Sequence, residues 1–289
     1  MSTSQAQTTN EAVKVTADSS RIPPFLRWAG GKRWLVPQIL DLIGDEPISR
    51  YHEPFLGGAS VFFSLDVSDK VFLSDLNTDL IEVYRQVRDK PVEVAALLSE
   101  YENTSAAYYA ARSDRPADAV QRAARFIFLN HTSFNGIFRV NLKGEYNVPF
   151  GNRASTNAPD EAWLIRASQR LQGAELTGAD FERALGEVRE GDLVFLDPPY
   201  TVAHNNNGFV KYNQHLFSFA DQERLAAAIG TISGLGAKFI LTNAAHVSID
   251  RLFSPIGRKL TVSRRNAIGG KQAARGSAEE YVFTNIEAK

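Results

Sequence analysis

The apolar run Leu193–Leu196, followed directly by Asp197-Pro198-Pro199-Tyr200, constrains the fold of this chain more than any other segment. The run is opened by the turn-like pair Gly191-Asp192 and predicts a short buried strand. Such a strand delivers the residues that follow it to the carboxyl edge of an open α/β sheet, where these sheets bind ligands. The two prolines fix their φ angles and remove two N–H donors from the turn. The segment therefore presents a carboxylate, a carbonyl and an aromatic ring, which together suit a planar amine; a simple loop after a strand is the alternative.

Asp-Pro-Pro-Tyr resembles the catalytic motif of the amino-group DNA methyltransferases, which transfer a methyl group from S-adenosylmethionine to adenine N6 or cytosine N4. Other segments between residues 25 and 285 resemble the same family in the same order, and the chain is similar to the Dam-type (DpnII-like) adenine-N6 methyltransferases. The resemblance implies that the catalytic residues are Asp197, Pro198, Pro199 and Tyr200. Cytosine-N4 enzymes more usually carry serine in the first position, so Asp197 favours adenine.

Segments within the first 90 residues predict a cofactor site at the same sheet edge. Residues 25–32 contain the pair Gly30-Gly31, which lets the backbone approach a ligand closely. Residues 51–55 predict the first strand, and Gly57-Gly58 predicts a tight turn into a helix, as in many nucleotide-cofactor sites. A second predicted strand ends at Asp75, whose carboxylate suits ribose hydroxyls. The Gly-x-Gly-x-x-Gly spacing of dinucleotide sites does not occur, which disfavours an NAD-dependent enzyme.

The resemblance also implies roles for individual cofactor-binding residues. Trp28 is expected to pack near the methionine part of S-adenosylmethionine, and Lys32 to meet its carboxylate. Asp180 is expected to accept a hydrogen bond from the adenine amino group, and Phe181 to pack on the adenine ring. The alternative for the first pair is a core aromatic and a surface lysine. The full set of expected cofactor contacts is Trp28, Ala29, Gly30, Lys32, Glu53, Pro54, Phe55, Gly57, Asp75, Asp180, Phe181 and Asp197.

The middle of the chain interrupts the α/β alternation. Apolar residues at helical spacing predict helices over residues 91–102, 106–112, 116–130 and 159–171. Apolar residues also alternate on both sides of Lys143-Gly144, which predicts a β-hairpin within residues 135–151. We therefore predict an α/β, Rossmann-like methyltransferase sheet built from residues 21–89 and 172–289. A mostly helical target-recognition domain is inserted between its two parts, at residues 90–171.

The resemblance implies that the hairpin contacts DNA. The expected DNA-binding residues are Asn135, Arg139, Asn141 and Lys143. Because arginine can donate two hydrogen bonds to O6 and N7 of guanine, Arg139 is the predicted base reader. Its alternative role is that of a cross-strand partner of Glu145.

The Gly- and Arg-rich loop at residues 264–276 is a predicted phosphate contact, and the polar residues 204–208 predict a mobile loop.

Composition limits the remaining possibilities. The net charge of −1 does not indicate a nucleic-acid binder, although basic residues cluster locally. The chain has no cysteine, which excludes disulfides, thiolate zinc sites and the usual mechanism of C5-cytosine methylation. No apolar run approaches the ~18 residues that span a membrane. Residues 1–20 are polar, which predicts a disordered tail rather than a signal peptide. We expect a cytoplasmic monomer that acts on double-stranded DNA and needs no metal.

Three functions fit these observations. The first is methylation of adenine N6 after base flipping, in a family that commonly targets GATC. The second is methylation of cytosine N4, and the third is a non-catalytic DNA-binding relative. Intact Lys32, Asp75 and Asp197 favour an enzyme. The sequence is compatible with a restriction–modification system, a phage or mobile element, or a solitary regulatory enzyme.

Overall fold

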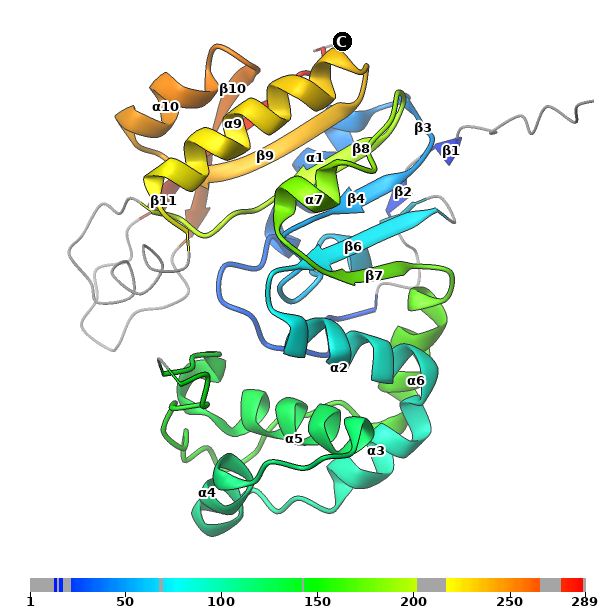
Figure 1. Cartoon of the computed structure of the whole chain (residues 1–289), viewed down its shortest axis with the longest axis vertical. Coiled ribbons are helices and arrows are strands. Elements are labelled where there is room, and N and C mark those ends of the chain that lie inside the picture. The colour runs from blue at the N-terminus through cyan, green and yellow to red at the C-terminus, as the bar shows by residue number, and fades with distance from the viewer. Residues whose placement is uncertain are drawn as a thin grey trace, which may run out of the picture.

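The computed structural model describes residues 13–14, 16–17, 22–67, 70–141, 143–201, 217–265 and 277–287. A seven-stranded sheet has the strand order β10-β11-β9-β8-β4-β6-β7, and a group of helices lies beyond its β7 edge (Figure 1). Strands β4, β6, β7, β8 and β9 are parallel, whereas β11 is antiparallel to both β9 and β10. The predicted α/β class is therefore confirmed. The strands are β4 (Tyr51–Glu53), β6 (Val71–Asp75), β7 (Glu175–Gly178), β8 (Leu193–Leu196), β9 (Lys238–Ala244), β10 (Arg258–Arg265) and β11 (Ser277–Thr284).

Both faces of the central strands are buried. Leu193 and Phe195 of β8 belong to one apolar cluster, and Val194 and Leu196 belong to another. A strand covered on both faces has a continuous apolar sequence rather than an alternating one, which is why this segment could be predicted. The helices α9 and α10 cover one face, with α1 behind the sheet (Figure 1). The elements on the two faces are η1 (Arg33–Leu35), α1 (Val36–Ile43), α7 (Phe181–Leu185), α9 (Phe219–Gly234) and α10 (Val247–Phe253).

The helices of the inserted segment share a core with the sheet. An apolar cluster continues from Leu73 of β6 through Leu80 to Ile127. The division of the chain into two domains therefore stays a prediction, but the helices expected within the insertion are confirmed with small shifts at their ends. These helices are α3 (Pro91–Ser99), α4 (Ser105–Ser113), α5 (Ala119–Thr132) and α6 (Glu161–Leu171). They follow α2 (Thr78–Asp89), which comes directly after β6 and before the predicted insertion.

The segment between α5 and α6 forms the expected hairpin after the short helix η3 (Phe134–Gly136). Val140 and Tyr146 form an antiparallel bridge, and the Asn141 amide donates to the Glu145 carbonyl at 2.8 Å. The side-chain Oδ1 of Asn141 closes the turn because it also accepts from the backbone N–H of Glu145, at 3.0 Å. The alternating pattern around Lys143-Gly144 was thus a correct hairpin signal.

Two local expectations differ from the structure. The strands β1 (Val13–Lys14) and β2 (Thr16–Ala17) pair with β3 (Pro47–Ile48) and β5 (Leu65–Asp66), whereas a tail without regular structure was expected there. The helix expected after Gly57-Gly58 is replaced by a short 3-10 helix, η2 (Phe62–Ser64). Residues 61–65 are all buried, so they lack the polar face of an amphipathic helix. The predictions for residues 204–208 and 266–276 lie outside the described residues.

Two features are absent from the described residues. None of their helices is both long and apolar enough to cross a membrane. In the same part of the chain, no group of three or more histidine, cysteine, aspartate or glutamate side chains is placed to hold a metal ion.

Candidate active site

Predicted site residues meet at the carboxyl ends of neighbouring parallel strands. Strand β4 ends at Glu53, β6 ends at Asp75, and β8 leads directly into Asp197. Strand β7 ends beside β6, because Gly178 is the register partner of Asp75. Asp180 follows two residues later, so the acidic side chains predicted from separate segments lie at one edge of the sheet.

Asp197 is fixed by two contacts to the same carboxylate oxygen. Lys32 Nζ lies 2.9 Å from Oδ1. Thr242 Oγ1 donates a hydrogen bond to Oδ1 at 2.6 Å, and Thr242 belongs to the neighbouring strand β9. The Asp197 side chain is 20% exposed, so a ligand can still approach it. The arrangement makes the carboxylate a positioned hydrogen-bond acceptor.

Lys32 is buried, with 2% of its surface exposed, so the surface alternative is wrong. Its Nζ donates to the Gly30 carbonyl at 2.7 Å and pairs with Asp197. The same atom lies 3.7 Å from Glu280 Oε2 and 5.0 Å from the centroid of the Tyr200 ring. These partners offset the cost of burying an ammonium group. Lys32 therefore joins the glycine segment to the Asp-Pro-Pro-Tyr motif, and its contact with a cofactor carboxylate stays a prediction.

Tyr200 is held by a residue that sequence analysis missed. Its hydroxyl donates to Glu280 Oε2 at 2.8 Å. Burial, followed by the charges of Asp197 and Glu280, raises the pKa of Tyr200, so the phenol keeps the proton that it donates. Glu280 lies on β11, where it is the register partner of Ala244 near the end of β9. The sequence offered one signal for Glu280, a carboxylate at the beginning of an apolar strand. Its position beside Tyr200 depends on the pairing of β11 with β9, which the sequence does not show.

The second proline of the motif is also anchored by residues that were missed. Gln222 is fully buried in the first turn of α9, and its Nε2 donates to the Pro199 carbonyl at 3.5 Å. Its Oε1 accepts from Asn243 Nδ2 at 2.9 Å. Pro198 is buried beside it. Gln222 and Asn243 thus connect α9 and β9 to the Asp-Pro-Pro-Tyr motif.

Asp75 organises the glycine turn as well as the end of β6. Its Oδ2 accepts from the Gly57 amide and its Oδ1 from the Asn77 amide, both at 2.9 Å. Asn77 in turn caps α2 by accepting from the Leu80 amide at 3.1 Å. Each carboxylate oxygen can accept another hydrogen bond, so the predicted ribose contact is chemically compatible. Leu76 is 64% exposed and adds an apolar surface that sequence analysis missed.

Glu53 turns into the protein and is only 3% exposed. Its Oε2 accepts from the Tyr51 hydroxyl at 2.8 Å and from the Phe62 amide at 3.2 Å. Burial raises the pKa of Glu53 to about 8 despite these hydrogen bonds, and the nearby charge of Asp197 acts in the same direction. Pro54 is buried beside it. Cofactor contacts of Glu53 and Pro54 stay predictions.

Trp28 packs on the glycine turn. A Cβ at Gly57 would lie 2.7 Å from the indole, and one at Gly58 would lie 2.8 Å from the Trp28 Cβ, so the turn needs glycine at both positions. The indole also stacks on Phe138 of the inserted segment, with ring centroids 5.6 Å apart. Trp28 is partly buried and packs against the apolar core, as the core-aromatic alternative expected. Its contact with the methionine part of the cofactor stays a prediction. Ala29, next to Trp28, is exposed.

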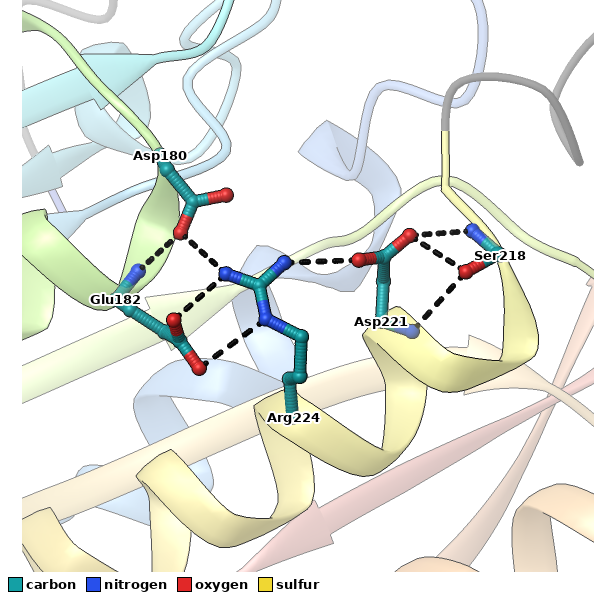
Figure 2. A network of polar contacts seen from close by, with 5 residues as sticks. All are labelled: Asp180, Glu182, Ser218, Asp221 and Arg224. Carbon is teal, nitrogen blue, oxygen red and sulfur yellow. Dashed lines mark hydrogen bonds and ion pairs between the residues drawn. The ribbon is translucent and has the colours of Figure 1, made fainter.

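Asp180 and Phe181 share one neighbour, Arg224 of α9. Arg224 Nη2 donates to Asp180 Oδ1 at 2.9 Å (Figure 2). Phe181 is 4% exposed, with the Arg224 guanidinium carbon 4.9 Å from its ring centroid. Phe55 and Phe217 pack on the same ring, at 5.5 and 5.7 Å between centroids. A ring covered to this extent offers little open face, so adenine packing on Phe181 stays a prediction.

The expected DNA-binding residues lie on the hairpin. Arg139 is exposed, and its Nε donates to Asn147 Oδ1 at 2.8 Å. Its cross-strand partner is therefore Asn147, and not Glu145 as the alternative proposed. Lys143 is exposed at the turn, where its amide donates to Asn141 Oδ1 at 2.9 Å. Their contact with DNA stays a prediction.

The start of the hairpin segment lies against residues 25–32, the predicted cofactor segment. A Cβ at Gly136 would lie 2.7 Å from Arg27 Nε. The Asn130 side chain, near the end of α5, forms two hydrogen bonds with the Arg27 backbone. It accepts from the Arg27 N–H and donates to the Arg27 carbonyl, both at 2.8 Å. Between them, Asn135 is exposed and has a φ of +56°, and Phe134 is 52% exposed. Phe134 is a further aromatic surface that sequence analysis missed.

The strand order, with β11 antiparallel between β9 and β10 and acidic residues at the ends of β6 and β8, is consistent with the fold of S-adenosylmethionine-dependent methyltransferases. Residues 28–266 match the model of the D12 class N6 adenine-specific DNA methyltransferases. The chain belongs to this family, which confirms the resemblance inferred from its motifs.

Individual relatives agree with this assignment. The chain is 34% identical over 273 residues to the Type II methyltransferase M1.LlaDCHI of Lactococcus lactis subsp. cremoris, covering 91% of this chain and 95% of the relative. It is 34% identical over 209 residues to a DNA adenine methylase of Escherichia coli K12, covering 70% and 73%. It is 31% identical over 288 residues to a DNA N-6-adenine-methyltransferase of Escherichia phage P1, covering 96% of this chain and 37% of that protein.

Proposed function

We propose that this chain binds S-adenosylmethionine and methylates N6 of an adenine flipped out of duplex DNA. The observation that carries the proposal is the fixed Asp197 carboxylate, held by Lys32 and Thr242 directly after β8. A positioned carboxylate followed by two prolines and a tyrosine matches the needs of a planar amine.

The described residues fit S-adenosylmethionine. Asp75 and Asp180 lie at the ends of adjacent strands, where one suits ribose hydroxyls and the other an amino group. Leu76 supplies an exposed apolar surface beside them. At Gly30, whose φ is +88°, a Cβ would meet only Lys32 Nζ within 4 Å among the described residues, so the backbone can approach a ligand there.

The catalytic turn would activate the amine through hydrogen bonding. An adenine amino group is a poor nucleophile because its lone pair is delocalised into the ring. Asp197 and the Pro198 carbonyl would accept its two N–H hydrogens, which favours a pyramidal nitrogen with an available lone pair. Pro199 is the less suitable acceptor, because Gln222 already donates to its carbonyl. The bound cofactor supplies an electrophilic methyl group on its sulfonium.

Electrostatics favour the same step. Lys32 faces both Asp197 and Glu280, which leaves one negative charge in excess around the turn. The amine gains positive charge during transfer, so fixed negative charge stabilises the transition state. Tyr200, held by Glu280, would stack on the flipped base. Flipping costs a few kcal/mol, so the turn must bind the base as well as activate it.

DNA recognition is assigned to the hairpin and its base. Arg139 would read guanine, with Asn135, Asn141 and Lys143 as further contacts. The exposed ring of Phe134 can stack on bases. GATC is the first target sequence to test. A monomeric state and a cytoplasmic location stay predictions.

One assay separates this proposal from its alternatives. The purified chain is incubated with methyl-labelled S-adenosylmethionine and DNA carrying randomised sites, and the DNA is digested to nucleosides for mass spectrometry. We expect N6-methyladenine from the wild type. Asp197→Ala is expected to lose a hundredfold or more in rate, since one lost stabilising contact typically costs ~10²–10³. N4-methylcytosine as the product would support the cytosine alternative, and no methylated base would support a non-catalytic relative.

A further inference from the structure

Arg224 contacts both residues that are assigned to the adenine end of the cofactor. It donates to Asp180 Oδ1 at 2.9 Å and lies over the Phe181 ring at 4.9 Å. Asp180 and Phe181 follow β7, whereas Arg224 lies on α9, 44 positions after Asp180. One side chain from a distant element therefore fixes two neighbouring residues of the predicted adenine site.

The guanidinium is itself fixed by carboxylates on both sides (Figure 2). Arg224 Nε and Nη2 bind the two carboxylate oxygens of Glu182, at 3.2 and 2.6 Å. Its Nη1 donates to Asp221 Oδ1 at 2.8 Å, while the other oxygen of Asp221 accepts from the Ser218 amide and hydroxyl. Exposed ion pairs contribute little singly, but a bidentate guanidinium shared by several carboxylates has a defined geometry.

Asp180 is oriented by this network through one oxygen. Its Oδ1 accepts from Arg224 and also from the Glu182 amide at 3.0 Å, as the cap of α7. Figure 2 shows both contacts at this oxygen, with the second oxygen turned in another direction. The Asp180 side chain is 40% exposed, so without such contacts it would rotate freely in solvent.

We propose that Arg224 is a positioning residue that makes this enzyme select the amino group of its cofactor's adenine. By holding Oδ1 of Asp180, it directs the second carboxylate oxygen at the 6-amino group. The inference rests on the proposed function, in which Asp180 accepts a hydrogen bond from that group. An analogue with a carbonyl at this position places an acceptor against a fixed carboxylate, and binding is lost. A carboxylate released from Arg224 can turn away, which removes the discrimination.

The test measures this discrimination directly. Calorimetry compares the affinities for S-adenosylhomocysteine and S-inosylhomocysteine, in which a carbonyl replaces the 6-amino group. We expect the wild type to prefer the amino ligand by about a hundredfold, within the range for sites that hydrogen-bond a specific group. Arg224→Gln and Asp180→Asn should reduce this preference at least tenfold. Arg183→Gln is the matched control, because Arg183 is an exposed arginine of the same helix α7 as Glu182. It should keep the wild-type preference.

Each outcome separates the inference from the proposed function. A wild type without preference would remove the assigned role of Asp180, and the inference with it. Loss of preference in Asp180→Asn but not in Arg224→Gln would overturn the inference and leave the proposed function intact. Equal weakening of both ligands in Arg224→Gln would also overturn it, because it would show a merely structural role. Arg224→Lys, measured in the same way, replaces Arg224→Gln if that variant does not fold. It keeps the charge but not the bidentate geometry, and should lose most of the preference.

Discussion

At the scale of single residues, the candidate site depends on the position of the Lys32 ammonium group between two carboxylates. The ammonium group faces Asp197 at 2.9 Å and Glu280 at 3.7 Å while almost fully buried. The same Glu280 oxygen accepts the Tyr200 hydroxyl. One buried lysine thus links Asp197, the proposed acceptor of the amine, to Tyr200, the ring proposed to stack on the base. A substitution of Glu280 should therefore affect both residues.

Glu280→Gln should lower the methyl-transfer rate about tenfold, equivalent to ~1.4 kcal/mol of transition-state stabilisation. The amide still accepts the Tyr200 hydroxyl, so the expected loss reports the missing charge beside Lys32. Single-turnover assays at saturating DNA and cofactor measure it. Glu279→Gln is the control, because Glu279 is the exposed neighbour on β11. Similar rates in the two variants would contradict a role for Glu280.

Glu53 should make stability depend on pH. Burial raises its pKa from 4.5 to about 8, so the folded state binds this proton more tightly than the unfolded state. The free energy of unfolding should therefore fall as pH rises between these values, by at most about 1.4 kcal/mol per pH unit. Glu53→Gln, which cannot ionise, should show a smaller loss between pH 5.5 and 8.5 in urea unfolding. Glu175→Gln, at an exposed position of β7, should behave as wild type. Equal pH dependence in all three proteins would rule out a perturbed Glu53.

At the scale of elements, α9 and the hairpin connect the predicted subsites. The first turns of α9 place Gln222 against Pro199 of the predicted catalytic motif and Arg224 against Asp180. A displacement of this helix would therefore reach both the base and the adenine end of the cofactor. The hairpin instead presents the exposed side chain of Arg139, which is braced by Asn147. Bracing favours a reader of bases, because it reduces the entropy that a long side chain loses on binding.

Arg139→Ala should relax the preference for one base position. A bidentate contact to guanine is worth ~1–3 kcal/mol of discrimination. Methylation profiles over a randomised DNA library at two salt concentrations measure the effect. Arg115→Ala removes another exposed arginine beside the hairpin, 3.9 Å from Glu145, and should leave the profile unchanged. A uniform loss of binding with a salt slope lowered by about one would instead identify Arg139 as a phosphate contact.

At the scale of the whole molecule, the inserted segment and the sheet are joined beside the site. Asn130 binds the Arg27 backbone at both its N–H and carbonyl, and His131 Nε2 lies 2.8 Å from the Phe25 carbonyl. Trp28 then stacks on Phe138. The segment that leads to Lys32 therefore takes its position from the helices that carry the hairpin, which is predicted to bind DNA.

Asn130→Ala should destabilise the protein and weaken cofactor binding. It leaves two partly buried backbone groups of Arg27 without their partners, at a cost of up to ~1–3 kcal/mol for each group that water does not reach. Urea unfolding and calorimetry with S-adenosylhomocysteine measure the two effects. Asn103→Ala, which loses a contact to the Arg153 carbonyl within the inserted segment, should lower stability without changing cofactor affinity. Unchanged affinity in Asn130→Ala would show that the segment holds its position without this contact.

Local sequence determined much of this architecture. The apolar run before Asp197, the strand ending at Asp75, the helices of the insertion and the turn at Lys143-Gly144 were all predictable. Each depends on residues close together in the chain, through the period of apolar side chains or the backbone demands of a turn. The family could be inferred for the same reason, because its motifs are short and contiguous. The helix expected after Gly57-Gly58 failed where burial on all sides removed that period.

Tertiary structure alone decided which side chains support the motifs. Glu280 meets Tyr200 across 80 positions, and Arg224 meets Asp180 across 44. Thr242 reaches Asp197 only because β9 lies beside β8. Lys32 is buried beside two carboxylates from distant parts of the chain, Asp197 after β8 and Glu280 on β11. These contacts depend on the order of the strands in the sheet. That order is determined by the burial of apolar surface between distant segments, so it cannot be inferred from the spacing of residues within one segment.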